Sequence, residues 1–139
     1  MEELRERNNL IYVCSPLNAP TQEGIESNMK KAAHYCEVLE KMIPGSRCIA
    51  PHSFIPAYLN DNNPAEREIG LQFGISVLKI SSAIIVCGNV VSRGMAAEIE
   101  LAAEEGIPAY FYHEAGQLSV LSDAEGHELW QVNTSAATA

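Results

Sequence analysis

Basic residues are scarce in this sequence. Its 139 residues include 9 Lys and Arg against 18 Asp and Glu, which gives a formal net charge of −9. Nucleic-acid backbones and anionic membrane surfaces both bind basic protein faces, so this balance argues against either as a partner. A small anionic ligand is not excluded, because a single local pocket can bind it within an acidic protein.

The four cysteines show no C-x-x-C spacing, which is the pattern of many zinc sites and of thioredoxin-type redox pairs. Cys14, Cys36, Cys48 and Cys87 all stand in apolar surroundings, and we expect them to be reduced, buried side chains. No metal site is indicated, and we expect a function that needs no cofactor.

Long apolar runs are absent as well. No stretch approaches the roughly 18 apolar residues of a membrane span, and the start, MEELRERNN, lacks the apolar segment of a signal peptide. We therefore expect a cytoplasmic protein with no membrane partner. The length predicts one domain over 1–139, with its core at about 9–113 and an uncertain tail at 114–139.

Short apolar runs alternate with amphipathic segments along the core. The runs 9–16, 46–52, 82–88 and 107–113 read as strands, and 21–43, 64–80 and 92–105 read as helices. Between them, 53–63 reads as a loop with one helical turn, and 116–123 and 127–132 as short strands or turns. This alternation predicts an α/β fold, a small flavodoxin-like or Rossmann-like three-layer sandwich with a four- to five-stranded, mainly parallel sheet.

The helix predicted at 64–80 has an apolar stripe at helical spacing. Ile69, Phe73, Val77 and Ile80 share one face of a helical wheel. We expect this face to pack against the sheet.

Ligands of such folds bind at the carboxyl ends of the parallel strands. This rule selects three loops: Ser15–Asn18, which includes Pro16, then Pro51–Phe54, and Gly88–Gly94. In the third loop, Ser92 stands where a helix N-cap belongs, and Gly94 would allow a ligand close to the backbone. A helix N-terminus attracts anions, although Ser92 as a simple cap and Gly94 as a turn residue remain the alternative.

The helix at 92–105 carries several acids that the helical wheel separates. Glu98 falls beside Met95, Leu101 and Ala102, whereas Glu100 and Glu104 point toward solvent. Glu98 lies about 9 Å along the helix from Ser92. A partly buried glutamate at this place can act as a nucleophile or as a general acid or base.

The motif S-R-G-M-A-A-E at 92–98 resembles the nucleoside 2-deoxyribosyltransferase-like superfamily. Four other segments follow one another in the same order as in that superfamily: IYVCSPL, APHSF, AEREIGLQFGISVLKISSAIIVCG and GIPAYFY. The resemblance covers about residues 9–113 and is closest to small uncharacterised bacterial and phage domains. Serine at the first place of the motif is similar to the branch of 2'-deoxynucleoside 5'-monophosphate N-hydrolases.

The resemblance implies a role for each matching residue. Glu98 takes the place of the nucleophile that attacks the anomeric carbon of the sugar. Ser92, with the backbone around Gly94 and Met95, takes the phosphate-binding place. Tyr12 and Ser15 take the places of the first-loop pocket residues.

Two positions depart from the family's pattern. The hydrolases carry an acid on the helix before the third strand, where this chain reads Gly70–Gly74 without an acid, and Ser82 replaces a frequent aspartate. The departures put catalysis in question without removing the pocket.

Two further residues are candidates for the same site. His52 ends the second strand, and we consider a ligand or acid–base role beside a structural one. Arg67 is either solvated, in contact with a phosphate, or paired with a carboxylate.

These observations lead to a working hypothesis. The chain would hydrolyse or transfer the N-glycosidic bond of a (deoxy)nucleoside or its 5'-monophosphate, with Glu98 as nucleophile. The alternatives are a nucleotide-binding or sensing module without turnover, and a structural interaction domain. Family members commonly pair, so we expect a homodimer or higher homo-oligomer, to which the tail around Trp130 would contribute unless it covers its own sheet edge.

Overall fold

The computed structural model describes residues 8–122. The strands are β1 (Leu10–Cys14), β2 (Arg47–Ile49), β3 (Ala83–Val86), β4 (Ala109–His113) and β5 (Gln117–Ser122). The α-helices are α2 (Gln22–Met42), α3 (Ile55–Tyr58), α4 (Pro64–Ile80) and α5 (Arg93–Glu104), and a 3-10 turn, η1, covers Pro51–Ser53. The strands and helices predicted between residues 9 and 122 are thus present.

The strands form one sheet in the order β2-β1-β3-β4-β5. Strand β1 pairs in parallel with both β2 and β3, and β3 pairs in parallel with β4. The last strand, β5, is antiparallel to β4, because a tight turn at Gly116 joins them. The α/β prediction is confirmed, and the sheet of the described residues has five strands, of which four are parallel.

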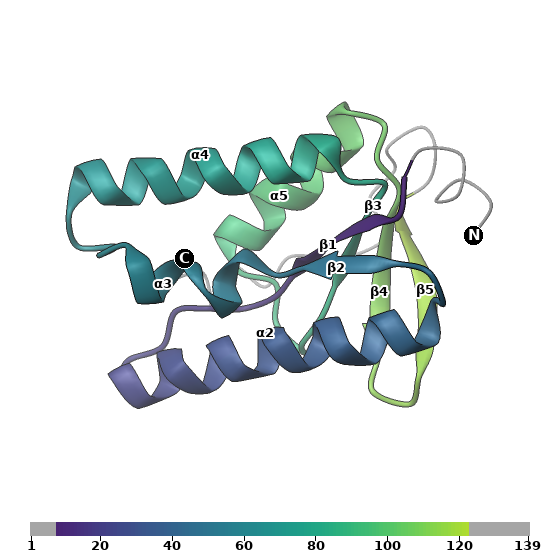
Figure 1. Ribbon diagram of the computed structural model, residues 1–139, viewed down its shortest axis with the longest axis horizontal. Helices are drawn as coiled ribbons and strands as arrows, with labels where there is room; N and C mark the ends of the chain where they lie inside the picture. Colours follow the sequence, from purple (N-terminus) through teal and green to yellow (C-terminus); the bar gives the residue numbers. More distant parts are fainter. Residues whose placement is uncertain (1–7, 123–139) are drawn as a thin grey trace.

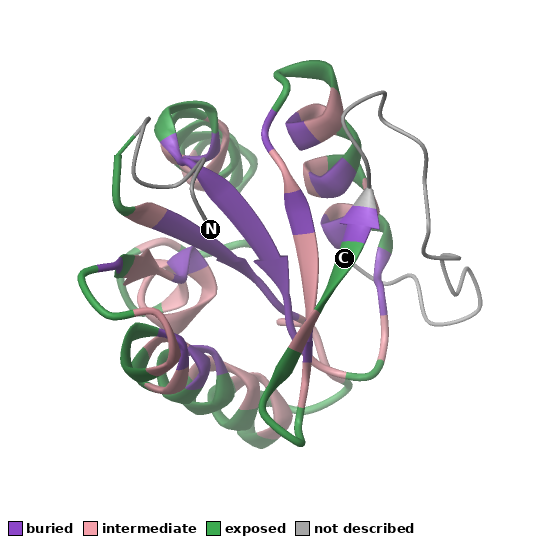
Figure 2. Ribbon diagram, turned by 90° about the vertical axis from the view of Figure 1, so that its right-hand side faces the viewer, coloured by how far each residue is buried: buried purple, intermediate pink, exposed green. Residues whose placement is uncertain are grey.

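The sheet is the middle of three layers. Helix α2 covers one face, and α4 and α5 cover the other (Figure 1). The side chains of the central strands alternate between these layers, so Ile11 and Val13 pack with α2, whereas Tyr12 and Cys14 pack with α5. Figure 2 shows the buried strands at the centre and the exposed sides of the helices facing outward. Each buried Ile or Leu contributes about 1.5–3 kcal/mol relative to exposure.

Helix α4 packs on a face that the sequence pattern did not predict. Ile69 and Ile80 are 57% and 64% exposed, and Phe73 is also exposed, although its ring makes an edge contact with Phe54. The helix turns Leu78 toward the core instead. Of the four residues on the predicted face, Val77 does pack against the core, whereas the prediction is wrong for Ile69, Phe73 and Ile80. Gly70 and Gly74 lie on the pocket side of α4, and apolar periodicity does not register glycines.

The second strand is shorter than predicted. It ends at Ile49, and Pro51–Ser53 form the turn η1, which includes His52. Proline has no N–H to donate to a strand ladder and suits the first position of a helical turn. The single helical turn expected within 53–63 is α3.

All four cysteines are free thiols. Cys14 and Cys87 are buried as predicted, whereas Cys36 and Cys48 are only partly buried. The latter two lie at the edge of the α2 layer, where α2 meets the short outer strand β2.

Part of the predicted tail is now placed. Strand β5 accounts for the segment predicted at 116–123, up to Ser122. The segment 127–132, with Trp130 and His127, lies outside the described residues. Among residues 8–122, none of the helices has the length and apolar character needed to cross a membrane.

Candidate functional site

Helix α5 places Glu98 at the centre of the candidate site. Ser92 caps this helix, and its hydroxyl accepts a hydrogen bond from the backbone N–H of Met95 at 3.3 Å. Met95, Ile99 and Ala102 then lie against the sheet. Glu98 is partly buried beside this stripe, whereas Glu100 and Glu104 are exposed, as the wheel predicted.

Strand β1 supplies two hydrogen-bond donors to Glu98, one for each carboxylate oxygen. The Tyr12 hydroxyl donates to Oε2, and the Cys14 thiol, 3.3 Å away, donates to Oε1. Tyr12 and Cys14 are two residues apart, so both side chains leave the strand on the α5 face. The carboxylate is therefore fixed in orientation by a buried strand.

Burial raises the pKa of Glu98 above its usual value, while His52 and the donors Tyr12 and Cys14 oppose this by stabilising the ionised form. Burial, together with the neighbouring Glu98, raises the pKa of both the Tyr12 phenol and the Cys14 thiol. These two groups keep their protons and remain donors when Glu98 ionises.

His52 is held at the edge of the same site. Its Nδ1 lies 2.8 Å from the carbonyl oxygen of Ser15, an arrangement that assigns the proton to Nδ1. This hydrogen bond therefore links the loop after β2, which includes the turn η1, to the loop after β1. With Nδ1 as donor, Nε2 is left as the nitrogen that accepts a proton.

Glu98 lines a large open pocket of about 890 Å³. The predicted residues Tyr12, His52, Arg67 and Gly94 line it too. Residues of α2, α3 and α4 complete its walls. A pocket of this volume is of the size that accepts small organic ligands.

A second, smaller cavity of about 300 Å³ opens at the same edge of the sheet. Four predicted residues line it, namely Ser15, Pro16, Gly88 and Ser92. Leu17 and Asn18 line both cavities. The predicted residues are therefore brought to one edge of the sheet but are divided between two adjoining cavities.

Met95 lines neither cavity, unlike the other predicted residues. Its side chain is buried in the core, and its N–H donates to the Ser92 hydroxyl. The sequence grouped Met95 with Ser92 and Gly94 as a phosphate-binding segment. In the structure, the Met95 side chain packs in the core and its N–H completes the cap of α5.

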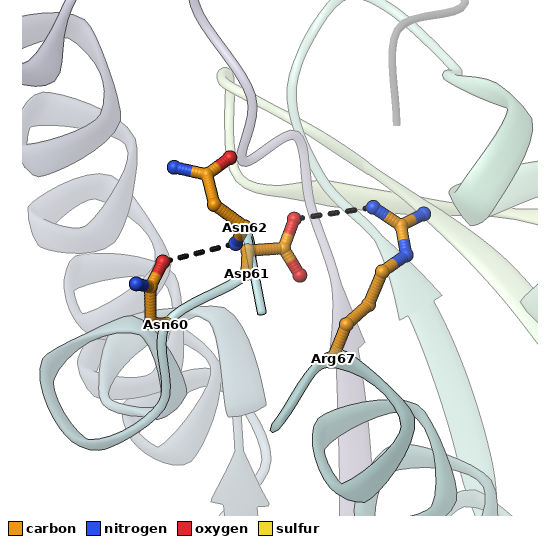
Figure 3. A network of polar contacts seen from close by, with 4 residues as sticks. All are labelled: Asn60, Asp61, Asn62 and Arg67. Atoms are coloured by element: carbon orange, nitrogen blue, oxygen red, sulfur yellow. Dashed lines mark hydrogen bonds and ion pairs between the residues drawn. The ribbon is translucent and has the colours of Figure 1, made fainter. Parts of the chain in front are cut away.

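Arg67, which lines the large pocket, makes an ion pair with Asp61 (Figure 3). Its Nη1 lies 3.3 Å from Oδ2 of Asp61, and both side chains are more than half exposed. The turn that holds Asp61 is fixed by Asn60, whose side-chain oxygen accepts from the N–H of Asn62 at 2.9 Å. Such exposed pairs contribute at most about 1 kcal/mol, so Arg67 remains available to solvent or to a ligand.

The part of α4 that lacks an acid, Gly70–Gly74, forms part of the pocket wall. Gly70 and Gly74 line its wall, and a Cβ atom at Gly74 would lie 3.3 Å from the Tyr12 hydroxyl. The carboxylates that do line the pocket, besides Glu98, are Asp61 and Glu66 among the described residues. Sequence reasoning missed both, since they stand in a turn and a helix start with no motif.

The loop after β3 depends on Gly88. Its φ is 99°, and an added Cβ would lie 3.0 Å from Cδ of Pro16. Gly116 has a similar φ of 90° but no atom within 4 Å of such a Cβ. Comparing alanine substitutions at Gly88 and Gly116 therefore separates the free-energy cost of a positive φ from that of the contact with Pro16.

We expect Gly88→Ala to lower the free energy of unfolding by about 2 kcal/mol or more, and Gly116→Ala by about 1 kcal/mol. The difference arises because Gly88→Ala also pushes Pro16 and the first loop aside. Urea unfolding of both variants measures it. Equal losses would show that Pro16 moves without cost.

The comparisons with known proteins agree with this architecture. The structure resembles that of a 2-deoxyribosyltransferase from the psychrotolerant bacterium Bacillus psychrosaccharolyticus, with a TM-score of 0.58 and 17% sequence identity over 74% of this chain and 71% of the other. The chain therefore shares the α/β fold of that enzyme. At this identity, the likeness concerns the fold.

The family follows from the sequence. The model of the family described as Domain of unknown function (DUF7768) matches residues 9–112, and the chain belongs to that family. No curated protein matches the chain.

Proposed function

We propose that this protein cleaves the N-glycosidic bond of a nucleoside or nucleoside 5'-monophosphate, with Glu98 as the nucleophile. The observation that carries the proposal is the Glu98 carboxylate, which both Tyr12 and Cys14 orient at the wall of a large open pocket. A fixed carboxylate with free space beside it is what attack on an anomeric carbon requires.

The reaction would proceed in two displacements. Glu98 forms an ester bond to the anomeric carbon, and the base leaves with the electron pair of the glycosidic bond and takes up a proton. Water, or a second base, then attacks the same carbon, gives its proton to the group that protonated the leaving base, and releases the Glu98 carboxylate. The first outcome is hydrolysis and the second is transfer.

The leaving base needs a proton donor, and the glycines of α4 do not provide one. His52 and Glu66 are titratable groups that line the same pocket. His52 is the better placed of the two, since its ring is held at the Ser15 carbonyl next to the loop that follows Tyr12 and Cys14, whereas the Glu66 carboxylate accepts from the backbone N–H of Asn60. We assign it the acid–base part of the mechanism.

A second candidate function is ligand binding without turnover. The specific observation that favours it is the absence of a carboxylate at Gly70 and Gly74, where the pocket wall approaches Tyr12. In that case Glu98 would hold a sugar hydroxyl by a hydrogen bond and would not form a covalent bond.

One experiment separates the two functions. Calorimetry measures binding of the common deoxynucleosides, ribonucleosides and their 5'-monophosphates, and liquid chromatography then analyses the same mixtures for free base. We expect base release from at least one of them. Tight binding with an intact ligand after long incubation would establish the binding module instead.

A further inference from the structure

Two of the four cysteines meet at the β2 edge of the sheet. Cys36 lies on α2 and Cys48 is the middle residue of the three-residue strand β2. Both side chains pack against the same core cluster, in the α2 layer. They are only partly buried, because β2 is an edge strand of the described sheet, whereas Cys14 and Cys87 are fully buried. Cys36 and Cys48 are therefore the two thiols that a reagent in solution can reach.

The position of Glu40 shows that this face of α2 lies over Cys48. The Glu40 carboxylate accepts a hydrogen bond from the backbone N–H of Cys48 at 2.8 Å. Cys36 and Glu40 are four residues apart, so they lie one turn apart on the same face of the helix. The Cys48 thiol in turn donates a hydrogen bond to the sulfur of Cys36. The two sulfur atoms are thus neighbours, although both are free thiols.

This hydrogen bond makes the two thiols chemically unequal. Donation from Cys48 lowers the pKa of the Cys36 thiol and raises the pKa of Cys48, while burial and the carboxylates of Glu40 and Glu37 oppose the lowering at Cys36. Because the thiolate is the reactive form, Cys36 is the attacking sulfur of the pair. Its negative charge is one of the causes that hold the proton on Cys48, so Cys48 becomes easier to ionise once Cys36 has reacted.

We propose that Cys36 and Cys48 are a redox-active pair, which a peroxide converts to a reversible disulfide bond between α2 and β2. This inference does not depend on the proposed function. It concerns a part of the sheet edge for which the spacing of the cysteines in the sequence gave no signal, since the two are twelve residues apart.

The reaction proceeds in two steps. The Cys36 thiolate attacks one oxygen of the peroxide, the O–O bond breaks, Cys36 becomes a sulfenic acid, and the hydroxide that leaves takes up the proton that Cys36 had lost. Cys48 then loses its proton, its sulfur attacks the Cys36 sulfur, and the departing hydroxide takes up that proton as water. The two thiols lose two electrons, and hydrogen peroxide is reduced to two waters. A dithiol reductant restores both thiols by exchange and is itself oxidised to a disulfide.

The disulfide would also stabilise the fold. It would tie α2 to β2 directly before the turn η1, which packs against the same helix. A cross-link between residues twelve apart restricts the unfolded chain, and we expect the oxidised chain to melt about 5 °C above the reduced chain.

The test treats the reduced full chain with a small molar excess of hydrogen peroxide, and N-acetylcysteine treated alongside shows that the dose oxidises an ordinary thiol. Free thiols are then blocked with N-ethylmaleimide, and the chain is analysed by intact mass spectrometry and by tryptic mapping without reduction. We expect two of the four thiols to be lost, and the peptide of Cys36 to be linked to that of Cys48. Dithiothreitol should restore all four thiols.

Three variants assign the parts of the pair. In Cys48→Ser the reaction should stop at the sulfenic acid of Cys36, which dimedone traps, and in Cys36→Ser no disulfide should form and the melting temperature should not rise. Cys87→Ala is the matched control, because Cys87 is a neighbouring thiol of the same core cluster but is fully buried and donates to the carbonyl oxygen of Ile85. It should form the same disulfide as the wild-type chain.

Three results would overturn the proposal. Four free thiols at a dose that oxidises N-acetylcysteine would show that Cys36 and Cys48 only pack together. A disulfide between two chains, or one that includes Cys87, would assign the chemistry to other sulfurs. A sulfenic acid that persists on Cys36 of the wild-type chain would show that Cys48 does not resolve it. Base release by the reduced chain judges the proposed function separately.

Discussion

Replacing Glu98 by Gln should lower base release by about 10³-fold or more, because an amide cannot form the covalent bond to the anomeric carbon. The fold should tolerate the change, since Gln has nearly the same shape and its side-chain oxygen still accepts from Tyr12. Liquid chromatography of the released base measures the effect. Glu100→Gln is the matched control, as Glu100 lies two residues away on the exposed side of α5. Equal activity of the two variants would rule out Glu98 as the nucleophile.

The same variant makes a prediction about stability. Burial raises the pKa of Glu98 in the folded state, so the folded chain holds this proton more tightly than the unfolded chain does. The resulting stabilisation is present below the usual carboxyl pKa of about 4.3 and is lost as the pH rises through the raised value. Near neutral pH, Glu98→Gln should therefore melt at the wild-type temperature or higher, and this difference should shrink toward about pH 4. A variant that melts well below wild type at neutral pH would contradict the assigned direction of the shift.

Replacing Tyr12 by Phe should shift the pH dependence of catalysis. The Tyr12 hydroxyl donates to Glu98 and lowers its pKa against the effect of burial. Without that donor, Glu98 would ionise only at higher pH, and the rising limb of kcat/KM should move up by about one pH unit. Activity on the acidic side should fall by about tenfold and recover at higher pH.

The control for Tyr12→Phe is Tyr112→Phe. Tyr112 is also a buried tyrosine of the sheet, but it packs in the α2 layer against Tyr35, with ring centroids 6.0 Å apart. Its variant should leave the rising limb where it is. A loss of activity in Tyr12→Phe that is the same at every pH would mean that Tyr12 only positions Glu98.

The features of the site that could be predicted are those with local causes. Ser92 as a cap and Glu98 on the inner side of α5 follow from helix capping and from the helical period, which act within a few residues. The meeting of the first and third loops at one edge follows from the parallel sheet. These rules need no knowledge of distant contacts.

The remaining features depend on contacts between distant parts of the chain. Tyr12 and Glu98 are 86 residues apart, and their hydrogen bond has no local signature. On helix α4, Val77 is buried as predicted but Ile69, Phe73 and Ile80 are exposed, and two glycines line the pocket side, where they leave space that periodicity cannot detect.

The covalent bond between Glu98 and the sugar can be detected directly. A substrate identified in the panel is mixed with the wild-type chain, the reaction is stopped by acid during turnover, and the protein is analysed by intact mass spectrometry and peptide mapping. We expect a mass increase equal to one glycosyl group, located on the peptide at Glu98 and absent from Glu98→Gln. Base release during turnover with no such adduct, or an adduct at another residue, would contradict it.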